Sequence, residues 1–365
     1  MSKPFLASRL KRLVALPALL AFALVLGFSP INSAKAADPT PVRVAMFSWP
    51  GYAFWFLAKE KNFVPEIELD IQIIEDPYQS FGLMQAGQLD VASSTAEYGP
   101  LAAAEGNDIR LVAYTNPSHG TDQIIVRPEI ESAKDLKGKS VAVMEGGLTQ
   151  IFMGIWLEQN GVSIKDVTFN NLIMDDAMAA MISGQVDGGE FWEPYAKNVK
   201  ENLEGAKLMA DSSTPFWSKN GLLADAMYMR KGFIEEDDGK IAALTLKAYF
   251  EAVKFWRENP EEANEIMAKA LQFEIEDVEL VVGDGSEVGG IVIYGFSDSA
   301  KFMGAMDGDP ELEELGQHNG QIKDHYDLVS DWWVKFNLID EKPAFEDGVS
   351  MKPMQVLVDS GYEGE

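Results

Sequence analysis

Five segments of the sequence, each of which is expected to follow a β-strand, carry carboxylate or aromatic side chains between them. The segments are 47–54, 93–98, 116–122, 144–150 and 190–195. Their carboxylates are Glu97, Asp122, Glu145, Glu190 and Glu193. A buried carboxylate is costly unless it has a partner, so several of them at one cleft favour a cation over an anion. Each could instead cap a helix or lie on the surface, and Glu193, which precedes Pro194, is the best candidate for a cap.

The same five segments also carry aromatic rings, which suit a cation or a flat amide-like solute. They include the rings of Trp49, Tyr52, Phe54, Tyr98, Phe191 and Trp192. About half of them are expected to pack beneath the cleft. We expect Trp49, Tyr98 and Trp192 to face the ligand.

The five segments contain no Lys or Arg, and His119 is the only side chain in them that could carry a positive charge. An anion could still bind to backbone N–H groups at helix N-termini, and Ser94, Thr95 and Thr149 could donate hydrogen bonds to either class of ligand. We predict a site for a small cationic or amide-like nitrogen compound, such as guanidinium, urea, a methylated amine or a pyrimidine. Taurine, alkanesulfonates and nitrate are the alternative ligands. The predicted ligand contacts are Trp49, Tyr52, Thr95, Glu97, Tyr98, Asp122, Glu145, Thr149, Glu190 and Trp192.

The elements that would position these segments occur twice in the chain. Residues 42–63 (VRVAMFSWPGYAFWFLAKEKNF) and 140–162 (SVAVMEGGLTQIFMGIWLEQNGV) share an apolar run, a glycine-containing turn and an amphipathic stretch. Downstream, AGQLDVASSTAEYG at 86–99 is echoed by SGQVDGGEFWEPY at 183–195. Two α/β units with the same internal order predict two lobes with a cleft between them.

Strands and helices alternate in both units, which predicts parallel sheets with helices on both faces. Ligands of such sheets lie beyond the carboxyl ends of the strands, where the five segments would converge. The predicted strands are 41–47, 68–74, 91–94, 109–115, 140–144, 167–172 and 188–190, with 224–229 returning to the first lobe. From residue 240 the chain should be mainly helical, with a loosely ordered tail at 350–365.

The first 36 residues are predicted to be a signal peptide. Basic residues precede an apolar run at 14–28, which is too short to span a membrane comfortably, and Ala34-Lys35-Ala36 offers a cleavage site. The mature chain would start at Ala37 and be soluble, most simply in a bacterial periplasm. It holds no cysteine, which excludes disulfides and a lipid-anchored Cys. The formal charge of −28 argues against nucleic acids and anionic lipids as partners.

Four phrases resemble the periplasmic substrate-binding proteins of ABC importers, in their nitrate, sulfonate and taurine branch. They are W-P-G-Y at 49–52 running into FLAKEKNF, GLMQAGQLDVA at 82–92 followed by SSTAEY, SAKDLKGKSVAVMEGG at 132–147, and W-E-P-Y at 192–195. The resemblance covers about residues 41–338. It implies a two-lobed type II periplasmic-binding fold of the α/β class, with a mainly parallel sheet in each lobe and two crossover strands as the hinge.

The resemblance also implies lobe boundaries and partners. Lobe 1 would comprise residues 37–122 and 225–365, lobe 2 residues 123–224, and the chain would cross near 120–127 and 222–230. The protein would be a monomer that captures a small molecule and delivers it to an ABC permease and ATPase complex in the inner membrane. A sensor that reports its ligand to a membrane kinase would use the same fold.

Catalysis is not expected from this sequence. An enzyme relative of this fold, which makes a thiamine pyrimidine, would need a Cys-rich iron site and a cofactor-bearing lysine. The chain has no cysteine and three histidines, and it shows no nucleophile elbow, phosphate loop or paired-histidine metal motif. We therefore predict no catalytic residue, no metal and no cofactor.

Overall fold

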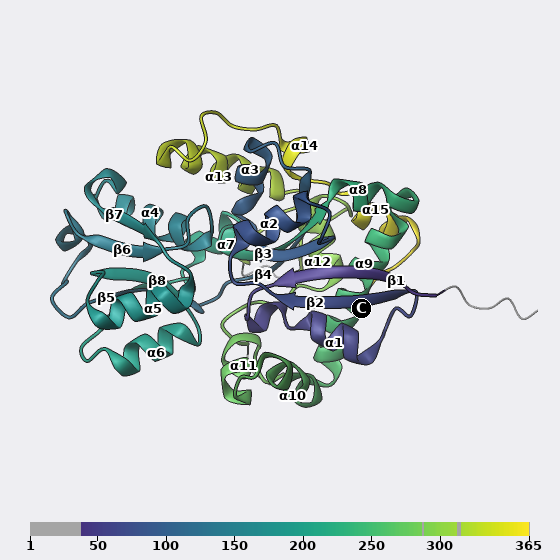
Figure 1. The fold of residues 1–365 in the computed structure, drawn as a ribbon, viewed down its shortest axis with the longest axis horizontal. Coiled ribbons are helices and arrows are strands. Elements are labelled where there is room, and N and C mark those ends of the chain that lie inside the picture. The colour runs from purple at the N-terminus through teal and green to yellow at the C-terminus, as the bar shows by residue number, and fades with distance from the viewer. Residues whose placement is uncertain (1–37, 287, 312–314, 365) are drawn as a thin grey trace, which may run out of the picture. The chain divides into compact units, whose positions relative to one another are not determined.

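The repeat in the sequence corresponds to two five-stranded sheets with the same strand order (Figure 1). The computed structural model describes residues 38–286, 288–311 and 315–364, so the predicted signal peptide lies outside the described residues. The first sheet has the order β2-β1-β3-β10-β4 and the second the order β7-β6-β8-β5-β9. We call the residues around the first sheet lobe 1 and those around the second sheet lobe 2.

Both sheets combine parallel and antiparallel pairs. In lobe 1, β1 pairs in parallel with β2 and β3, whereas β10 runs antiparallel to β3 and β4. In lobe 2, β6 pairs in parallel with β7 and β8, and β5 runs antiparallel to β8 and β9. The sheets are mixed because β5 and β10 each enter from the other lobe. The lobe 1 strands are β1 (Thr40–Met46), β2 (Ile67–Ile73), β3 (Val91–Thr95), β4 (Ile109–Pro117) and β10 (Ala224–Arg230). The lobe 2 strands are β5 (Asp122–Val126), β6 (Ser140–Val143), β7 (Thr168–Asn171), β8 (Gly188–Trp192) and β9 (Lys207–Asp211).

The β4 and β10 strands are buried over almost their whole length, as expected for strands covered on both faces. In lobe 1 the helices are α1 (Phe54–Lys61), α2 (Pro77–Gln85), α3 (Tyr98–Ala104), α8 (Lys231–Glu235), α9 (Lys240–Glu258), α10 (Pro260–Leu271), α11 (Ile275–Val282), α12 (Phe296–Met303), α13 (Ile322–Phe336), α14 (Phe345–Gly348) and α15 (Lys352–Asp359). In lobe 2 they are α4 (Leu148–Gln159), α5 (Met174–Ser183), α6 (Tyr195–Asn202) and α7 (Pro215–Lys219). Short 3-10 helices are η1 (Pro50–Tyr52), η2 (Ala133–Leu136), η3 (Ile164–Asp166) and η4 (Glu236–Gly239). Among the described residues, three core clusters form: one lies in lobe 1, one in lobe 2 under α5 and α6, and a third joins α4 of lobe 2 to α3 and α13 of lobe 1.

The C-terminal region is mainly helical, as predicted, but the expectation of a loosely ordered tail was wrong. Residues 352–359 form α15, in which Met354 and Leu357 are buried in the lobe 1 core. The amphipathic spacing of these residues lets α15 pack on α9 and close that side of the core.

The chain crosses between the two sheets at residues 118–121 and 212–223. The crossings are hydrogen-bonded to each other, because the Ser118 backbone N–H donates to the Leu223 carbonyl at 2.8 Å. Gly120 takes a φ of +108° in the first crossing, a conformation that favours glycine. The predicted lobe boundaries stay a prediction, although Asp122, which they place in lobe 1, begins β5 of the second sheet.

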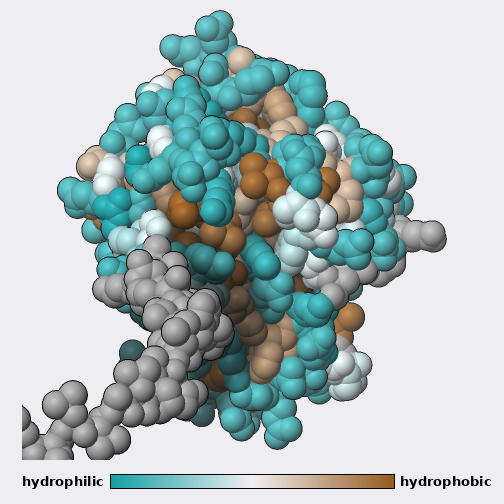
Figure 2. Space-filling model, turned by 90° about the vertical axis from the view of Figure 1, so that its right-hand side faces the viewer, coloured by the Kyte–Doolittle hydropathy of each residue, from teal (hydrophilic) through white to brown (hydrophobic). Residues whose placement is uncertain are grey.

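Hydrophilic residues dominate the face shown in Figure 2, and hydrophobic residues show mainly in its central part. Over residues 38–286, 288–311 and 315–364, none of the helices has the length and apolar character needed to cross a membrane.

Candidate ligand-binding site

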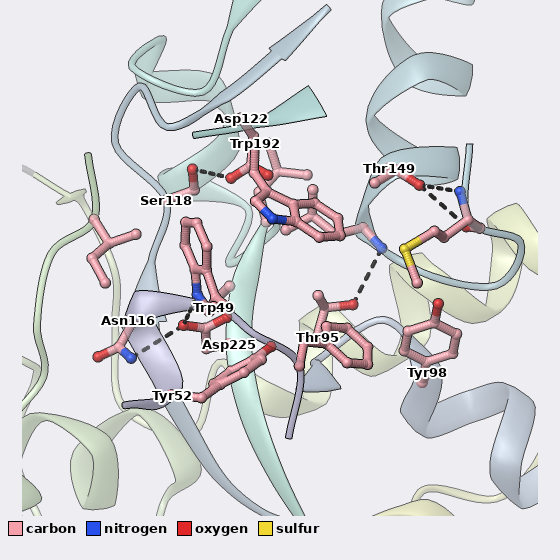
Figure 3. A pocket seen from close by; sticks show the side chains of 16 residues that line it. Trp49, Tyr52, Thr95, Tyr98, Asn116, Ser118, Asp122, Thr149, Trp192 and Asp225 are labelled. Carbon is pink, nitrogen blue, oxygen red and sulfur yellow. Dashed lines mark hydrogen bonds between the residues drawn. The ribbon is translucent and has the colours of Figure 1, made fainter. Parts of the chain in front are cut away.

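A cavity lies where the carboxyl ends of the parallel strands of both lobes converge (Figure 3). Its volume is about 30 Å³, far below the roughly 300 Å³ or more of ordinary small-molecule pockets. A solute of several heavy atoms can therefore enter only when the surrounding side chains move apart. The lining residues are Phe47, Trp49, Tyr52, Thr95, Tyr98, Asn116, Ser118, Asp122, Met144, Leu148, Thr149, Trp192, Leu223, Ala224, Asp225 and Ile291.

Asp225 is the carboxylate of lobe 1 in this cavity, at the start of β10. Its side chain is 6% exposed, and its Oδ2 accepts hydrogen bonds from Trp49 Nε1 and Asn116 Nδ2, both at 3.1 Å. Tyr52 also hydrogen-bonds to this carboxyl group. All three of these donor side chains, among the described residues, are uncharged. Burial raises the pKa of Asp225 to about 7, although the three hydrogen bonds oppose the shift.

Gly51 explains the spacing of the W-P-G-Y motif at this corner. A Cβ at position 51 would lie 2.3 Å from Trp49 Nε1 and 2.6 Å from Asp225 Oδ2. Only glycine leaves room for the indole and the carboxylate to meet over the backbone. The motif therefore positions the Trp49 ring against Asp225.

Asp122 is the carboxylate of lobe 2 in the cavity, at the start of β5, and is 4% exposed. The Ser118 hydroxyl donates to its Oδ2. Glu190 on β8 is fully buried close to it, and neither carboxyl oxygen of Glu190 has a hydrogen-bond partner among the described residues. Burial raises the pKa of Asp122 to about 6. Burial, followed by the Asp122 charge, raises the pKa of Glu190 well above its usual range, so Glu190 is the more readily protonated of the two carboxyl groups.

Glu97 lies in the same region but outside the cavity lining. Its side chain is fully buried, and its Oε1 accepts the Leu223 backbone N–H at 2.8 Å. Its Oε2 has no hydrogen-bond partner among the described residues. Burial raises the pKa of Glu97 to about 7. This carboxyl group therefore ties the β3–α3 connection to the second crossing, where Leu223 takes a φ of +60°.

Glu145 and Glu193 also lie outside the cavity lining. Glu145 lines a separate cavity of about 270 Å³ together with Asp76 and Asp176. Glu193 accepts the Lys197 backbone N–H in the first turn of α6 at 2.8 Å and pairs with Lys200 Nζ at 3.1 Å. Glu193 is therefore a helix cap, as predicted.

The aromatic side chains divide between the cavity wall and the core. Trp49 and Trp192 meet edge to face across the cavity, with ring centroids 6.2 Å apart, and Phe47 stacks on Trp192 at 6.4 Å. Tyr98 forms another part of the wall. Phe54 and Phe191 are fully buried in the cores. The three rings expected to face the ligand thus all line the cavity.

Hydroxyl groups and the N-terminus of α4 complete the site. Thr95 Oγ1 accepts the Leu148 backbone N–H at 3.2 Å, and Thr149 Oγ1 accepts the Met144 N–H at 2.6 Å. The N-terminus of a helix attracts anions, so this end of the cavity offers the best place for one. Among the described residues, those that line the cavity include no Lys, Arg or His.

Seven predicted contacts therefore line the cavity: Trp49, Tyr52, Thr95, Tyr98, Asp122, Thr149 and Trp192. Three do not: Glu97 and Glu190 are buried behind the wall, and Glu145 lines the separate cavity. That any of them contacts a ligand stays a prediction. The sequence reasoning missed Asp225 because it considered only the ends of parallel strands. The returning strand, β10, runs antiparallel, so its first residues lie at the same edge of the sheet.

This geometry defines a class of protein. Two sheets of equal strand order, two crossings between them and a cavity at the carboxyl ends of the strands characterise the two-lobed binding proteins. The family is shown by residues 49–263, which match the model of the NMT1/THI5-like family. The chain belongs to that family.

Similar proteins agree with this class. A protein of Brucella abortus that is named only as a binding protein is 26% identical over 273 residues, which are 74% of this chain and 83% of that protein. An Escherichia coli protein named as an aliphatic sulfonates-binding protein is 26% identical over 245 residues, 65% of this chain and 74% of that protein.

Solved structures confirm the two-lobed α/β fold. The alkanesulfonate-binding protein of Xanthomonas axonopodis, solved with bound MOPS, has a TM-score of 0.67 at 18% identity and covers 86% of this chain and 99% of its own. A desulfurization enzyme has a TM-score of 0.57 at 14% identity, covering 88% of this chain and 99% of its own. The resemblance to periplasmic binding proteins that the sequence indicated is thereby confirmed, while the fold is shared by at least one enzyme.

Proposed function

We propose that this chain is the periplasmic solute-binding component of an ABC importer and that its solute is a small cationic or amide-like nitrogen compound. The carrying observation is that Asp122 and Asp225 line a cavity with no basic side chain among its described lining residues. The family and the binding-protein fold support the transport role, with delivery to a permease and ATPase complex in the inner membrane.

A cation would stabilise both carboxylates. Each of them is buried with neutral donors around it, so its charge is largely uncompensated, and a positive solute lowers the free energy of the ionised form. Asp225 and Asp122 come from different lobes, which lets one solute engage both. Such a solute favours the closed arrangement by its differential affinity for the two states.

The rings select for shape. Trp49 and Trp192 present aromatic surfaces over which a flat or cationic solute can lie. Guanidinium, urea, methylated amines and pyrimidines combine these properties with N–H or N–CH₃ groups that match the carboxylates. We propose Trp49, Tyr52, Asp122, Trp192 and Asp225 as the principal contacts.

A sulfonate such as taurine or an alkanesulfonate is the second candidate. It is favoured by the names of several relatives and by the α4 N-terminus, whose residues Leu148 and Thr149 line the cavity. A bound anion would require Asp122 and Asp225 to be protonated, because two carboxylates beside a sulfonate repel it. This requirement makes the two candidates respond to pH in opposite directions.

A thermal-shift screen of residues 37–365 tests the proposal. One panel holds guanidinium, urea, choline, methylamines and pyrimidines, and the other holds nitrate, taurine and alkanesulfonates. A ligand of the native state raises the melting temperature as its concentration rises above Kd. We expect saturable shifts in the first panel. Saturable shifts confined to the second panel would replace the nitrogen compound by a sulfonate.

A further inference from the structure

We propose that residues 144–148, which connect β6 to α4, form a latch that docks on Tyr78 and Tyr98 of lobe 1 and holds the lobes together around the solute. Tyr78 is then a positioning residue for binding, although it lies outside the cavity lining. The inference rests on the proposed function only in assuming that a solute is enclosed between the lobes.

Two hydrogen bonds join the latch to lobe 1. The Tyr78 hydroxyl at the start of α2 donates to the Glu145 carbonyl at 3.0 Å. The Leu148 backbone N–H donates to Thr95 Oγ1 at 3.2 Å. These contacts connect residues of different sheets, and they use backbone groups of the latch, so they depend on its conformation rather than on its side chains.

Close packing provides the second part of the contact. A Cβ at Gly147 would lie 2.5 Å from the Tyr98 hydroxyl oxygen and 2.7 Å from its ring. A Cβ at Gly146 would lie 2.6 Å from Leu101 and 2.8 Å from the Tyr78 hydroxyl. Real Cβ atoms do not approach other atoms this closely, so glycine at both positions is required for the lobes to meet here.

The latch is preformed within lobe 2. The Gly146 N–H donates to Gln150 Oε1 at 2.8 Å, and the Glu145 N–H donates to Asn171 Oδ1 at 3.0 Å. Thr149 Oγ1 accepts a hydrogen bond from the Met144 backbone N–H and donates one to the Met144 carbonyl. These internal bonds hold the shape of the loop independently of lobe 1, so little ordering entropy is lost when it docks.

The position of the latch makes it effective. Met144 and Leu148 line the cavity, so the latch contacts the enclosed space directly. Figure 3 shows Tyr98 and Thr149 at one side of the cavity, and Asn116 and Ser118, next to the first crossing, at the other side. The contact of the latch with Tyr98 therefore lies across the cavity from the first crossing and resists rotation of the lobes about that crossing.

Gly147→Ala is the sharpest test. Gly147 has a φ of −109° and a ψ of −174°, which alanine adopts without strain, and the nearest atoms to the added Cβ all belong to Tyr98 of lobe 1. The substitution should therefore leave each lobe folded and hinder only their contact. Gly82→Ala in α2 is the matched control, because an added Cβ there has no atom within 4 Å among the described residues.

The lobe contact is measured by distances between two spin labels. The native sequence has no cysteine, so Lys59→Cys on α1 and Lys165→Cys on η3, both exposed, label one lobe each. The parent and Gly82→Ala should show a population with a short distance between the two labels, which corresponds to closed lobes. We expect this population to be smaller in Gly147→Ala, both without solute and with guanidinium chloride or taurine at about 1 mM. Equal distributions in Gly147→Ala and Gly82→Ala would overturn the latch, as would a parent that never shows the short distance.

Binding constants provide the second readout. For whichever solute of the two panels binds the parent, calorimetry should show the affinity of Gly147→Ala reduced about tenfold or more, since affinity scales with the closed fraction. Tyr78→Phe, which removes one hydrogen bond, should lose about two- to tenfold. Unchanged affinity in both variants would contradict the latch proposal. If the parent binds no cation, the proposed solute is wrong, and the distance measurement alone then tests the latch.

Discussion

A buried aspartate lies at each end of β10, and the two differ in whether their hydrogen-bond partners are charged. Beside its last residue, Asp90 is 3% exposed and accepts hydrogen bonds from Arg43 and Arg230, at 2.7 Å and 2.9 Å for the closest guanidinium contacts. At its second residue, Asp225 is 6% exposed and accepts from Trp49, Asn116 and Tyr52. Two carboxyl groups of nearly equal burial thus differ in the charge of their partners.

The difference sets their pKa values. Burial alone would raise the pKa of Asp90, but the Arg43 and Arg230 hydrogen bonds outweigh it and hold the pKa below its usual range. Burial raises the pKa of Asp225 to about 7 because neutral donors compensate it less. The first aspartate is compensated by two arginines, and for the second we propose that a bound solute supplies the compensating charge.

Lobe 2 repeats this division. Asp187, which occupies the position of Asp90 in the sequence repeat, pairs with Lys139 at 3.0 Å, and its pKa is lowered by the Ser140 N–H and Lys139 against the effect of burial. Asp122 in the cavity has its pKa raised by burial to about 6. In both lobes the carboxylate at the amino edge of the parallel strands is structural, and the one at the carboxyl edge faces the cavity.

The largest effect is expected from Asp225→Asn. Loss of a charge that compensates a buried cation costs several kcal/mol, so affinity for guanidinium should fall on the order of a hundredfold or more. The melting temperature of the ligand-free protein at pH 8 should stay equal or rise, because an uncompensated buried charge is removed. Calorimetry measures the affinity and thermal unfolding of the same preparation measures the melting temperature. A destabilised variant with normal affinity would show that Asp225 is structural and would contradict its proposed role in binding.

Asp90→Asn should do the opposite. It leaves two arginines without their carboxylate and should destabilise the protein by about 2 kcal/mol, less than for a fully buried pair because both guanidinium groups are partly exposed. Urea unfolding measures the change. Affinity per folded molecule should be unaltered, and a large loss of affinity at full occupancy of the folded state would contradict the structural role.

Stability and binding should respond to pH with opposite signs. Between pH 5 and pH 8, folded Asp122, Asp225 and Glu97, with pKa values of about 6, 7 and 7, release protons that the unfolded chain has already lost near pH 4. Their contribution to the free energy of unfolding is therefore present at low pH and lost as the pH rises through these values. The melting temperature of the ligand-free protein should fall over this range, while affinity for a cation rises. Scans at half-unit intervals test this, and a rising melting temperature that Asp225→Asn does not alter would contradict it.

Glu145→Gln should have the smallest effect. Its carboxylate lines the separate cavity and makes its contact with Tyr78 through the backbone carbonyl, which the substitution retains. We expect affinity for guanidinium to change by less than about twofold, as for charges at the rim of a site. A tenfold loss in calorimetry would show that the solute reaches beyond the cavity.

The sequence was informative where local pattern decides the structure. The repeat predicted two sheets, and the strand ends correctly placed Trp49, Asp122 and Trp192 at the cavity. It failed where the outcome depends on depth along a strand, since Glu190 lies on β8 two residues before Trp192 and is fully buried. Residues two apart on a strand share a face, and the pairing of Glu190 with Ile124, two residues deeper in the sheet than the Trp192–Asp122 pair, shows that Glu190 lies further from the strand end. Asp225 was missed because strand direction, not composition, puts it at the cavity.

The most direct test of the uncompensated carboxylates is calorimetric titration of residues 37–365 with guanidinium and with taurine, each at pH 6 and pH 8. We predict saturable binding of guanidinium that is tighter at pH 8, where Asp122 and Asp225 are ionised, and no saturable binding of taurine. Binding of taurine that is tighter at pH 6, with none of guanidinium, would show that the carboxylates are held neutral around an anion and would contradict the account.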